Sequence, residues 1–205
     1  MSGDYLDVIP RAGGAPIIGI GELSGRSLPA ALKSLSFKFA ARGVFAAGSD
    51  DFAKALEYLN SVMCDVLVDD EYASALFFTV AQAGGGLTLG NAGHDPPIVY
   101  RAATNLVEET PSDGLVLGIQ RGFIYDTREI ALASGDAAVF YTDGFTDARN
   151  ASGEPFTLRR LKAALHEFRA LGSQALADAL FEQIESYTIG TYRDEASVIV
   201  IRLDE

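Results

Sequence analysis

The chain has 205 residues, 48% of them hydrophobic, with 28 acidic against 16 basic side chains and a formal net charge of −12. That length and apolar content are enough for one substantial core, so we expect a single domain over residues 1–205. The negative charge argues against a nucleic-acid backbone or an anionic membrane surface as the main partner. It does not exclude a phosphorylated protein, because bound divalent cations would reverse the local field.

Features that report on cellular location favour the cytoplasm. Cys64 is the only cysteine, which excludes an intrachain disulfide and a thiolate metal cluster and indicates a reducing compartment. The N-terminal residues lack the basic and apolar segments of a signal peptide. The apolar stretch from Tyr72 to Gly90 is interrupted by Gln82 and three glycines, which indicates two strands and a turn rather than a membrane span.

The first third of the chain predicts two strands followed by two helices. The strands are Tyr5–Ile9 and Pro16–Ile20. Helical spacing follows the candidate N-cap Ser27, and its apolar residues are Leu28, Ala31, Leu32, Leu35 and Phe39. A second helix is predicted after Ser49-Asp50, and the apolar residues on its one face are Phe52, Leu56, Leu59, Met63 and Val66.

The rest of the chain predicts a run of strands, two more helices and a last strand. The expected strands are Ser74–Val80, Gly86–Leu89, Ile98–Arg101, Gly122–Ala131 and Ala137–Tyr141, with a hairpin turn at Gly84–Gly86. The helical stripes run from Leu158 to Phe168 and from Leu176 to Tyr187. Ala196–Leu203 is nearly all apolar and predicts a central strand. This order indicates an α+β fold in which antiparallel sheets have helix pairs on their faces.

Asp143 follows the unbroken apolar run Ala137–Phe140, which is typical of a strand covered on both faces. Alone, Asp143-Gly144 most often marks a hairpin turn. A carboxylate at the end of a buried strand is also held rigidly and reaches water, and this suits a hard metal cation or a catalytic base.

Three further acids have a similar setting beside a strand end or a glycine. Asp4 begins the first strand, Glu22 ends the second, and Asp194 precedes the last. Magnesium and manganese require several oxygen ligands and retain water, so a few convergent carboxylates are the expected protein contribution. Taken singly, each acid has the alternative of solvating a loop, and their spacing does not show that they converge.

Five sequence blocks occur in one order along nearly the whole chain. They are Gly3–Val8, Gly21–Ala31, Asn91–Pro97, Tyr141–Arg149 and Asp194–Val198. In sequence they are similar to Gly-Gly-Asp-Phe-Tyr-Asp, Gly-Asp-Val-Ser-Gly-Lys, Asn-Ala-Gly-His-X-Pro-Pro, Tyr-Thr-Asp-Gly-Val-Thr-Glu-Ala-Arg and Asp-Asp-X-Thr-Leu. The chain thereby resembles the stage II sporulation protein E/RsbU family, the bacterial serine phosphatases within the metal-dependent PPM phosphatases.

The resemblance implies a fold, a site and an activity. The fold would be a β-sandwich of two antiparallel sheets flanked by helix pairs. Two Mn²⁺ or Mg²⁺ ions would be held by Asp4, by Glu22 as the bridging acid, by the Leu23 carbonyl, and by Asp143 and Asp194. A hydroxide shared by the two ions would attack phosphorus.

The resemblance also implies partners. The substrate would be phosphoserine or phosphothreonine on a STAS-domain protein, such as an anti-sigma factor antagonist in a partner-switching pathway. The helices that follow Glu22 would respond to a regulatory protein or domain. Nucleic acid and membrane are not among the expected partners.

Two departures from the family pattern bear on this interpretation. Glu22 stands where the family has Asp, and one extra methylene shifts the carboxylate by roughly a bond length, while metal sites are sensitive to shifts well under about 1 Å. The family also has a further strand and helix before the first block. Either the sequence is shortened, or a sheet edge is left for another chain, such as a second copy in a homodimer.

Two rival functions therefore remain open. One is a pseudophosphatase that retains the fold as a binding module, and the weaker one is a metal phosphodiesterase acting on a nucleotide. Among the other reactive side chains, His94 is interpreted as a turn residue whose ring hydrogen-bonds its own loop, and Cys64 as part of the core. Arg26 and Arg149 receive no catalytic role.

Overall fold

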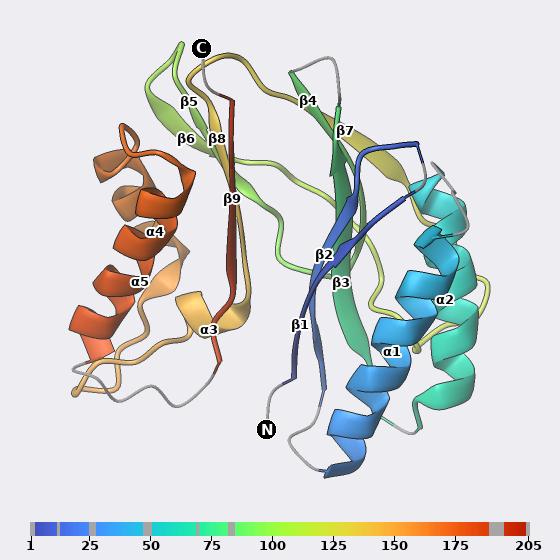
Figure 1. Ribbon diagram of the computed structural model, residues 1–205. Coiled ribbons are helices and arrows are strands. Elements are labelled where there is room, and N and C mark those ends of the chain that lie inside the picture. Colours follow the sequence, from blue (N-terminus) through green and yellow to red (C-terminus); the bar gives the residue numbers. More distant parts are fainter. Residues whose placement is uncertain are drawn as a thin grey trace. The chain divides into compact units, whose positions relative to one another are not determined.

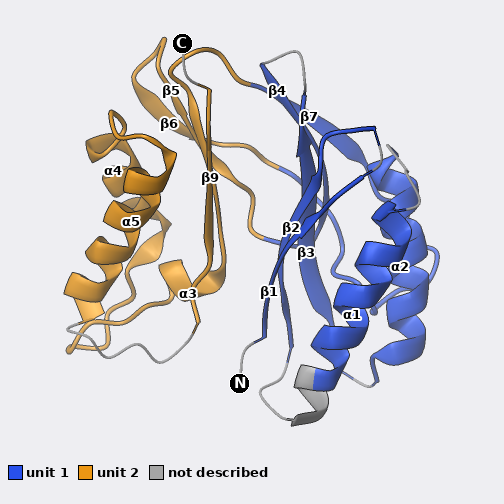
Figure 2. Cartoon of the chain, viewed as in Figure 1, with its two compact units in different colours: residues 1–94, 112–131 blue, residues 95–111, 132–205 orange. Residues whose placement is uncertain are grey.

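The chain forms two compact units, each an antiparallel sheet with a helix pair (Figure 2). The computed structural model describes residues 3–11, 13–24, 28–46, 51–68, 70–81, 85–188 and 195–203, and no side chains for residues 28–31. Unit 1 comprises residues 1–94 and 112–131, and unit 2 comprises residues 95–111 and 132–205. Of the described helices, none is long and apolar enough to cross a membrane.

Unit 1 contains a five-stranded sheet in the order β1-β2-β3-β4-β7, with all neighbours antiparallel. The strands are β1 (Asp4–Ile9), β2 (Ile17–Leu23), β3 (Ala73–Val80), β4 (Gly86–Ala92) and β7 (Thr127–Ala131). Helices α1 (Leu28–Ala46) and α2 (Phe52–Val66) lie side by side on one face of this sheet (Figure 1).

Unit 2 contains a four-stranded antiparallel sheet in the order β6-β5-β8-β9. The strands are β5 (Ile98–Arg101), β6 (Leu106–Glu109), β8 (Ala137–Tyr141) and β9 (Val198–Arg202). A short helix α3 (Asp143–Thr146) follows β8, and helices α4 (Thr157–Glu167) and α5 (Ser173–Thr188) pack on the sheet.

The predicted fold class is confirmed: the chain is α+β, with two antiparallel sheets and flanking helices. Several element predictions need correction. The segment predicted as a strand from residue 122 is extended only at Thr127–Ala131, and β6 was not predicted. The last strand is not central, because β9 ends the described strand order, and all five of its residues are only half-buried. The predicted N-cap Ser27, the pair Ser49-Asp50, and Gly84 lie outside the described residues.

Helix α1 forms as predicted but does not bury the residues whose spacing indicated it. Leu32, Leu35 and Phe39 are exposed by 50% or more. The buried residues are instead Phe37, Ala41 and Phe45, four apart and on one face. Because the helix is apolar around much of its circumference, spacing alone did not identify the face that packs on the sheet.

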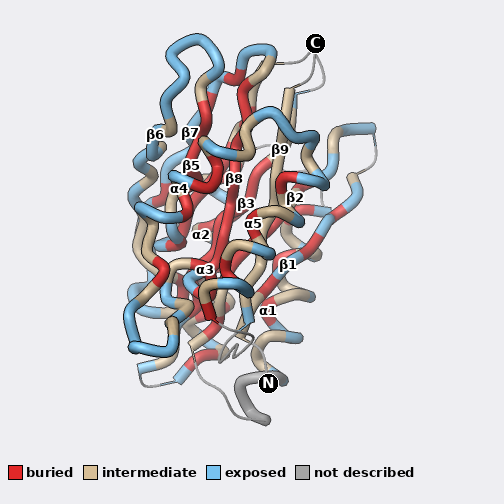
Figure 3. Tube along the Cα trace, turned by 90° about the vertical axis from the view of Figure 1, so that its left-hand side faces the viewer, coloured by how far each residue is buried: buried red, intermediate tan, exposed pale blue. Residues whose placement is uncertain are grey.

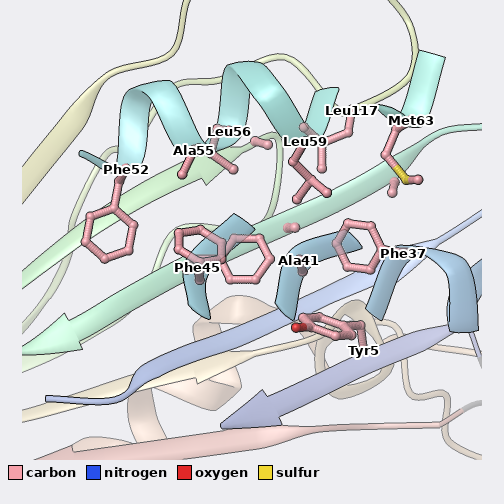
Figure 4. Close-up of a cluster of buried hydrophobic side chains, with 14 of the residues drawn as sticks. Tyr5, Phe37, Ala41, Phe45, Phe52, Ala55, Leu56, Leu59, Met63 and Leu117 are labelled. Atoms are coloured by element: carbon pink, nitrogen blue, oxygen red, sulfur yellow. The ribbon is translucent and has the colours of Figure 1, made fainter. Parts of the chain in front are cut away.

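The core of unit 1 is a cluster of aliphatic and aromatic side chains between the sheet and its two helices (Figure 4). The ring of Tyr5 meets Phe37 edge to face with centroids 4.8 Å apart. Phe45 lies 4.5 Å from Phe77 of β3 and 5.8 Å from Phe52 of α2. Aromatic pairs of this kind add stabilisation beyond their buried area, so α1 fixes the face of β1 that bears Tyr5.

Unit 2 has a separate core against β8. All five residues of β8 are buried, and this strand appears as one of the continuous buried traces in Figure 3. Immediately after it, Phe145 of α3 is fully buried and its ring lies 4.9 Å from Phe181 of α5. The turn that begins at Asp143 is therefore anchored by a core side chain two residues later.

A partly buried ion pair joins β1 to α1. Asp7 is 7% exposed, and it accepts two hydrogen bonds of 2.6 Å from the Nε and Nη2 atoms of Arg42. These bonds stabilise the carboxylate form, so they hold the pKa of Asp7 below its ordinary value. A group whose pKa is lowered by folding stabilises the fold above its ordinary pKa and ceases to do so as the pH falls through the lowered value.

We predict that Asp7→Asn lowers the free energy of unfolding by about 2 kcal/mol near neutral pH, because the charge-assisted hydrogen bonds are lost. In urea titrations the gap from the parent should be constant above about pH 5, should narrow below the ordinary aspartate pKa of about 4, and should close only as the pH falls through the lowered pKa of Asp7 in the folded parent. Asp126→Asn is the control, since its ion pair with Arg128 is 3.7 Å long and exposed. An Asp7→Asn gap that persists unchanged at low pH would contradict this account.

Candidate metal-binding site

Asp4 and Glu22 lie directly opposite each other on neighbouring strands of unit 1. In the antiparallel pair of β1 and β2, the Cα partner of Asp4 is Glu22. The N–H of Leu23 donates to the carbonyl of Gly3 at 2.8 Å, so Gly3 and Leu23 form a hydrogen-bonded pair and Asp4 and Glu22 the adjacent non-hydrogen-bonded pair. Side chains of such a pair share one face and lie especially close.

This face is the one opposite the helix pair. Tyr5 and Asp7 contact α1, and side chains alternate along a strand. Asp4 and Glu22 therefore point away from α1, and both are half-buried. Glu22 was predicted to end the second strand, and β2 continues one residue further, through Leu23, so the carboxylate is held by a regular sheet.

The backbone at Gly3 and Leu23 runs beside these carboxylates. A Cβ added at Gly3 would lie 2.6 Å from the Leu23 carbonyl oxygen, closer than real Cβ contacts allow, so this approach requires glycine. Leu23, whose carbonyl is the expected ligand, is next to Glu22 in the chain. Gly3, its strand partner, is next to Asp4.

Asp143, in unit 2, is exposed at the first position of α3. The residue before it, Thr142, is fully buried and is tied to the entry of β9. Its N–H donates to the Ser197 carbonyl at 3.1 Å, and its Oγ1 accepts from the Ser197 N–H at 2.9 Å. Asp143-Gly144 therefore begins a helical turn anchored on a neighbouring strand rather than a hairpin.

Gly144 brings this turn against the backbone of Glu195. A Cβ at Gly144 would lie 1.9 Å from the Glu195 carbonyl oxygen, so any side chain there would displace the backbone. Asp194 itself lies outside the described residues. Its neighbour Glu195 is nevertheless packed against the residue that follows Asp143.

Two further acids of unit 2 act electrostatically near Asp143. Partial desolvation, and then the negative charges of Asp143 and Asp147, raise the pKa of Asp95 above its ordinary value. Asp95 was not among the predicted site residues. In the sequence it occupies the variable position of the Asn-Ala-Gly-His-X-Pro-Pro block, between His94 and two prolines. Its nearness to Asp143 depends on the pairing of β5 with β8.

His94 makes a contact that its interpretation as a loop-bonding turn residue missed. The ring is buried, and Nδ1 lies 3.2 Å from the Oγ of Ser74 in β3. Ser74 is also buried and is the cross-strand partner of Glu22 in the β2–β3 pair. In unit 1, Asp4, Glu22 and Ser74 therefore occupy one row across three strands.

The other reactive side chains that the structure describes lie close to, or hydrogen-bond with, protein oxygens. Cys64 is half-buried in α2, with its Sγ 3.8 Å from the Asn60 Oδ1. The Nη1 of Arg149 donates to the Gly153 carbonyl at 2.7 Å within a turn. His166 lies 3.1 Å from the Asn105 carbonyl. Arg26 lies outside the described residues.

The structure thus brings Asp4, Glu22 and Leu23 together in unit 1 and places Asp143 in unit 2. Within the part of the chain that is described, no three His, Cys, Asp or Glu side chains form a metal-ligand cluster. The two opposed carboxylates and a nearby carbonyl are nonetheless hard oxygen donors of the kind that Mg²⁺ and Mn²⁺ prefer.

Comparison with known proteins identifies one family. Its profile, described as "Stage II sporulation protein E (SpoIIE)", matches residues 12–204 of this chain. The phosphoserine phosphatase RsbU of Bacillus subtilis (strain 168) is 26% identical over 208 residues, which cover 98% of this chain and 59% of that protein. The chain therefore spans less than two thirds of the length of this relative.

Solved structures show the same fold. The SiaA-PP2C domain of Pseudomonas aeruginosa has a TM-score of 0.84 at 22% identity, over 99% of this chain and 81% of that chain. The PP2C phosphatase domain and regulatory fragment of SpoIIE from Bacillus subtilis has a TM-score of 0.80 at 18% identity, over 98% of this chain and 58% of that chain. Because both sequence identities are low, the similarity shows only that the folds are alike.

We predict that Gly144→Ala lowers the free energy of unfolding by about 2–3 kcal/mol, because the added methyl forces the backbone of α3 away from Glu195. Gly43→Ala in α1 is the matched control, since its Cβ would meet nothing within 4 Å, and it should stabilise the protein by about 0.5–1 kcal/mol. Urea unfolding measures both. A Gly144→Ala variant as stable as the parent would show that the Asp143 turn is not packed as described.

Proposed function

The chain belongs to the stage II sporulation protein E family, and we propose that it is a metal-dependent phosphatase acting on phosphoserine or phosphothreonine in a signalling protein. Both units together would make up one phosphatase domain. The homologous RsbU protein is named as a phosphoserine phosphatase, which supports the reaction class. The RsbX structure, with a TM-score of 0.70, was determined in complex with magnesium, which supports a divalent cation.

The observation that supports this proposal most is the opposition of Asp4 and Glu22. Like charges directly opposite each other on one sheet face destabilise a strand pair. A cation bound between them would turn that repulsion into attraction, and two half-buried carboxylates on regular strands are positioned before the ion arrives. The opposed carboxylates therefore supply two oxygen donors on one sheet face where a cation could bind.

Each proposed ligand has a distinct task. Glu22 would bridge two ions, Asp4 would hold one of them directly or through water, and the Leu23 carbonyl would add a neutral oxygen. Asp143 and Asp194 would complete the site. When bound, Mn²⁺ or Mg²⁺ would activate a water molecule for attack on phosphorus and neutralise charge on the phosphoryl oxygens. Because the chain has a formal net charge of −12, bound cations would be needed to attract a phosphoryl group.

The resemblance to RsbU-type proteins extends the proposal to the substrate. We propose a phosphorylated STAS-domain protein as substrate, in a cytoplasmic partner-switching pathway. Helix α1 begins five residues after Leu23, so a regulatory partner that shifts α1 would act on the strand that bears Glu22. A homodimer across the edge strand β1 is a further arrangement that the topology allows.

We predict that the parent releases phosphate from p-nitrophenyl phosphate and from a phosphorylated STAS-domain protein when Mn²⁺ is supplied. Excess EDTA should abolish turnover, and added Mn²⁺ should restore it. Asp143→Asn should lower kcat by about 100-fold or more, because a ligand charge is lost at the metal site. Asp113→Asn, an exchange of the same kind outside the proposed site, is the control. Turnover that Asp143→Asn leaves intact would refute the assignment of this residue.

A second candidate function is a pseudophosphatase that binds partners without turnover, and the identity of Glu22 favours it. If Glu22 supports catalysis, the parent turns over phosphate, and Glu22→Asp changes the rate or the metal preference without creating activity. A parent that is inactive with Mn²⁺, together with a Glu22→Asp variant that is active, would establish the binding module instead. Phosphate release and Mn²⁺ titration of the two proteins decide between them.

A further inference from the structure

The buried contact between Ser74 and His94 adjoins Glu22, the proposed ligand that departs from the family pattern. Ser74 is 8% exposed and His94 is 5% exposed. The Oγ and Nδ1 atoms of this pair are 3.2 Å apart, within hydrogen-bond distance. Neither residue belongs to the ligand set expected for the metal ions, and a buried polar pair of this kind requires an explanation.

The loop that holds His94 is built rigidly. The backbone N–H of His94 donates to the Oδ1 of Asn91 at 2.8 Å, and the Nδ2 of Asn91 donates to the His94 carbonyl at 2.8 Å. The same Nδ2 atom is 2.7 Å from the Ser112 Oγ. Gly93 has a φ of +70°, and a Cβ there would lie 2.8 Å from the Val116 backbone nitrogen. The Asn-Ala-Gly-His block therefore fixes where the imidazole points.

The register of the sheet places Ser74 of this pair opposite Glu22. Ser74 is the direct partner of Glu22 across β2 and β3, so both side chains project from the same face. Directly opposed Cβ atoms are about 5 Å apart, close enough for a serine hydroxyl to meet a glutamate carboxylate. When His94 Nδ1–H donates to Ser74 Oγ, the serine O–H is left to donate towards Glu22.

We propose that Ser74 and His94 are positioning residues that orient the Glu22 carboxylate for metal binding. Ligating carboxylates in metal sites are themselves hydrogen-bonded by partners outside the ligand set. Glu22 has one more rotatable bond than the aspartate of the family pattern, so its carboxylate has more conformations to exclude. A hydroxyl fixed by a buried imidazole would select one of them. This inference rests on the proposed function.

Mn²⁺ affinity, measured by isothermal titration calorimetry without any substrate, tests the proposal. Ser74→Ala and His94→Phe should each weaken Mn²⁺ binding by about 10-fold. The double variant should be no weaker than either single variant, because both changes break the same chain of hydrogen bonds. His94→Asn, which places an amide N–H near the position of Nδ1, should keep most of the affinity.

A matched control separates positioning from general damage to the sheet. Thr79 is on the same strand, and its hydroxyl donates to the Pro16 carbonyl at 3.0 Å, away from Glu22. Thr79→Val should therefore leave Mn²⁺ affinity unchanged. Melting temperatures in EDTA show whether each variant is folded before metal is added. If Ser74→Ala proves unstable, His94→Phe still tests the hydrogen bond between Ser74 and His94.

The outcomes distinguish this inference from the proposed function. If the parent binds Mn²⁺, Asp4→Asn loses that binding, and folded Ser74→Ala and His94→Phe bind as the parent does, then the positioning role alone is overturned. If the parent does not bind Mn²⁺, the metal site fails and the positioning role fails with it. Equal losses in Thr79→Val and Ser74→Ala would also overturn the positioning role.

Discussion

The pairing of β2 with both of its neighbours is the constraint on which the candidate site depends. The β1–β2 register sets Asp4 opposite Glu22, and the β2–β3 register sets Ser74 opposite Glu22. Because the side-chain period of a strand is two, a slip of one residue in either pairing would turn these side chains to opposite faces. The aromatic contacts of Tyr5 with α1 and the Asp7–Arg42 ion pair hold β1 in this register from the helix side.

In each unit a glycine next to a proposed ligand allows backbone to approach backbone. Gly3 accommodates the Leu23 carbonyl in unit 1, and Gly144 accommodates the Glu195 carbonyl in unit 2. Each glycine adjoins a proposed ligand, Asp4 or Asp143. The Gly-Asp and Asp-Gly pairs of the sequence are thus steric requirements of the fold, and in neither case does the glycine simply turn a hairpin.

The sequence predicts the local parts of this structure better than the pairings. Helix α2 was predicted from the spacing of Phe52, Leu56 and Leu59, which are all buried. The motifs also predict Asp4, Glu22 and Asp143 as ligands, and that assignment stays a prediction. Ser74 could not be identified, because its pairing with Glu22 joins strands separated by two helices. Likewise β9 is apolar enough for a central strand, but the topology, which no local pattern encodes, places it at the end of the described order.

The central claim is that Glu22, although longer than the aspartate of the family pattern, binds a divalent cation together with Asp4. The most direct measurement is anomalous scattering at the manganese edge from crystals grown with Mn²⁺. The account predicts a manganese peak between the Asp4 and Glu22 carboxylates, about 2.0–2.2 Å from a Glu22 oxygen, as for a small hard cation. A crystal saturated with Mn²⁺ that shows no peak beside Glu22 would contradict it.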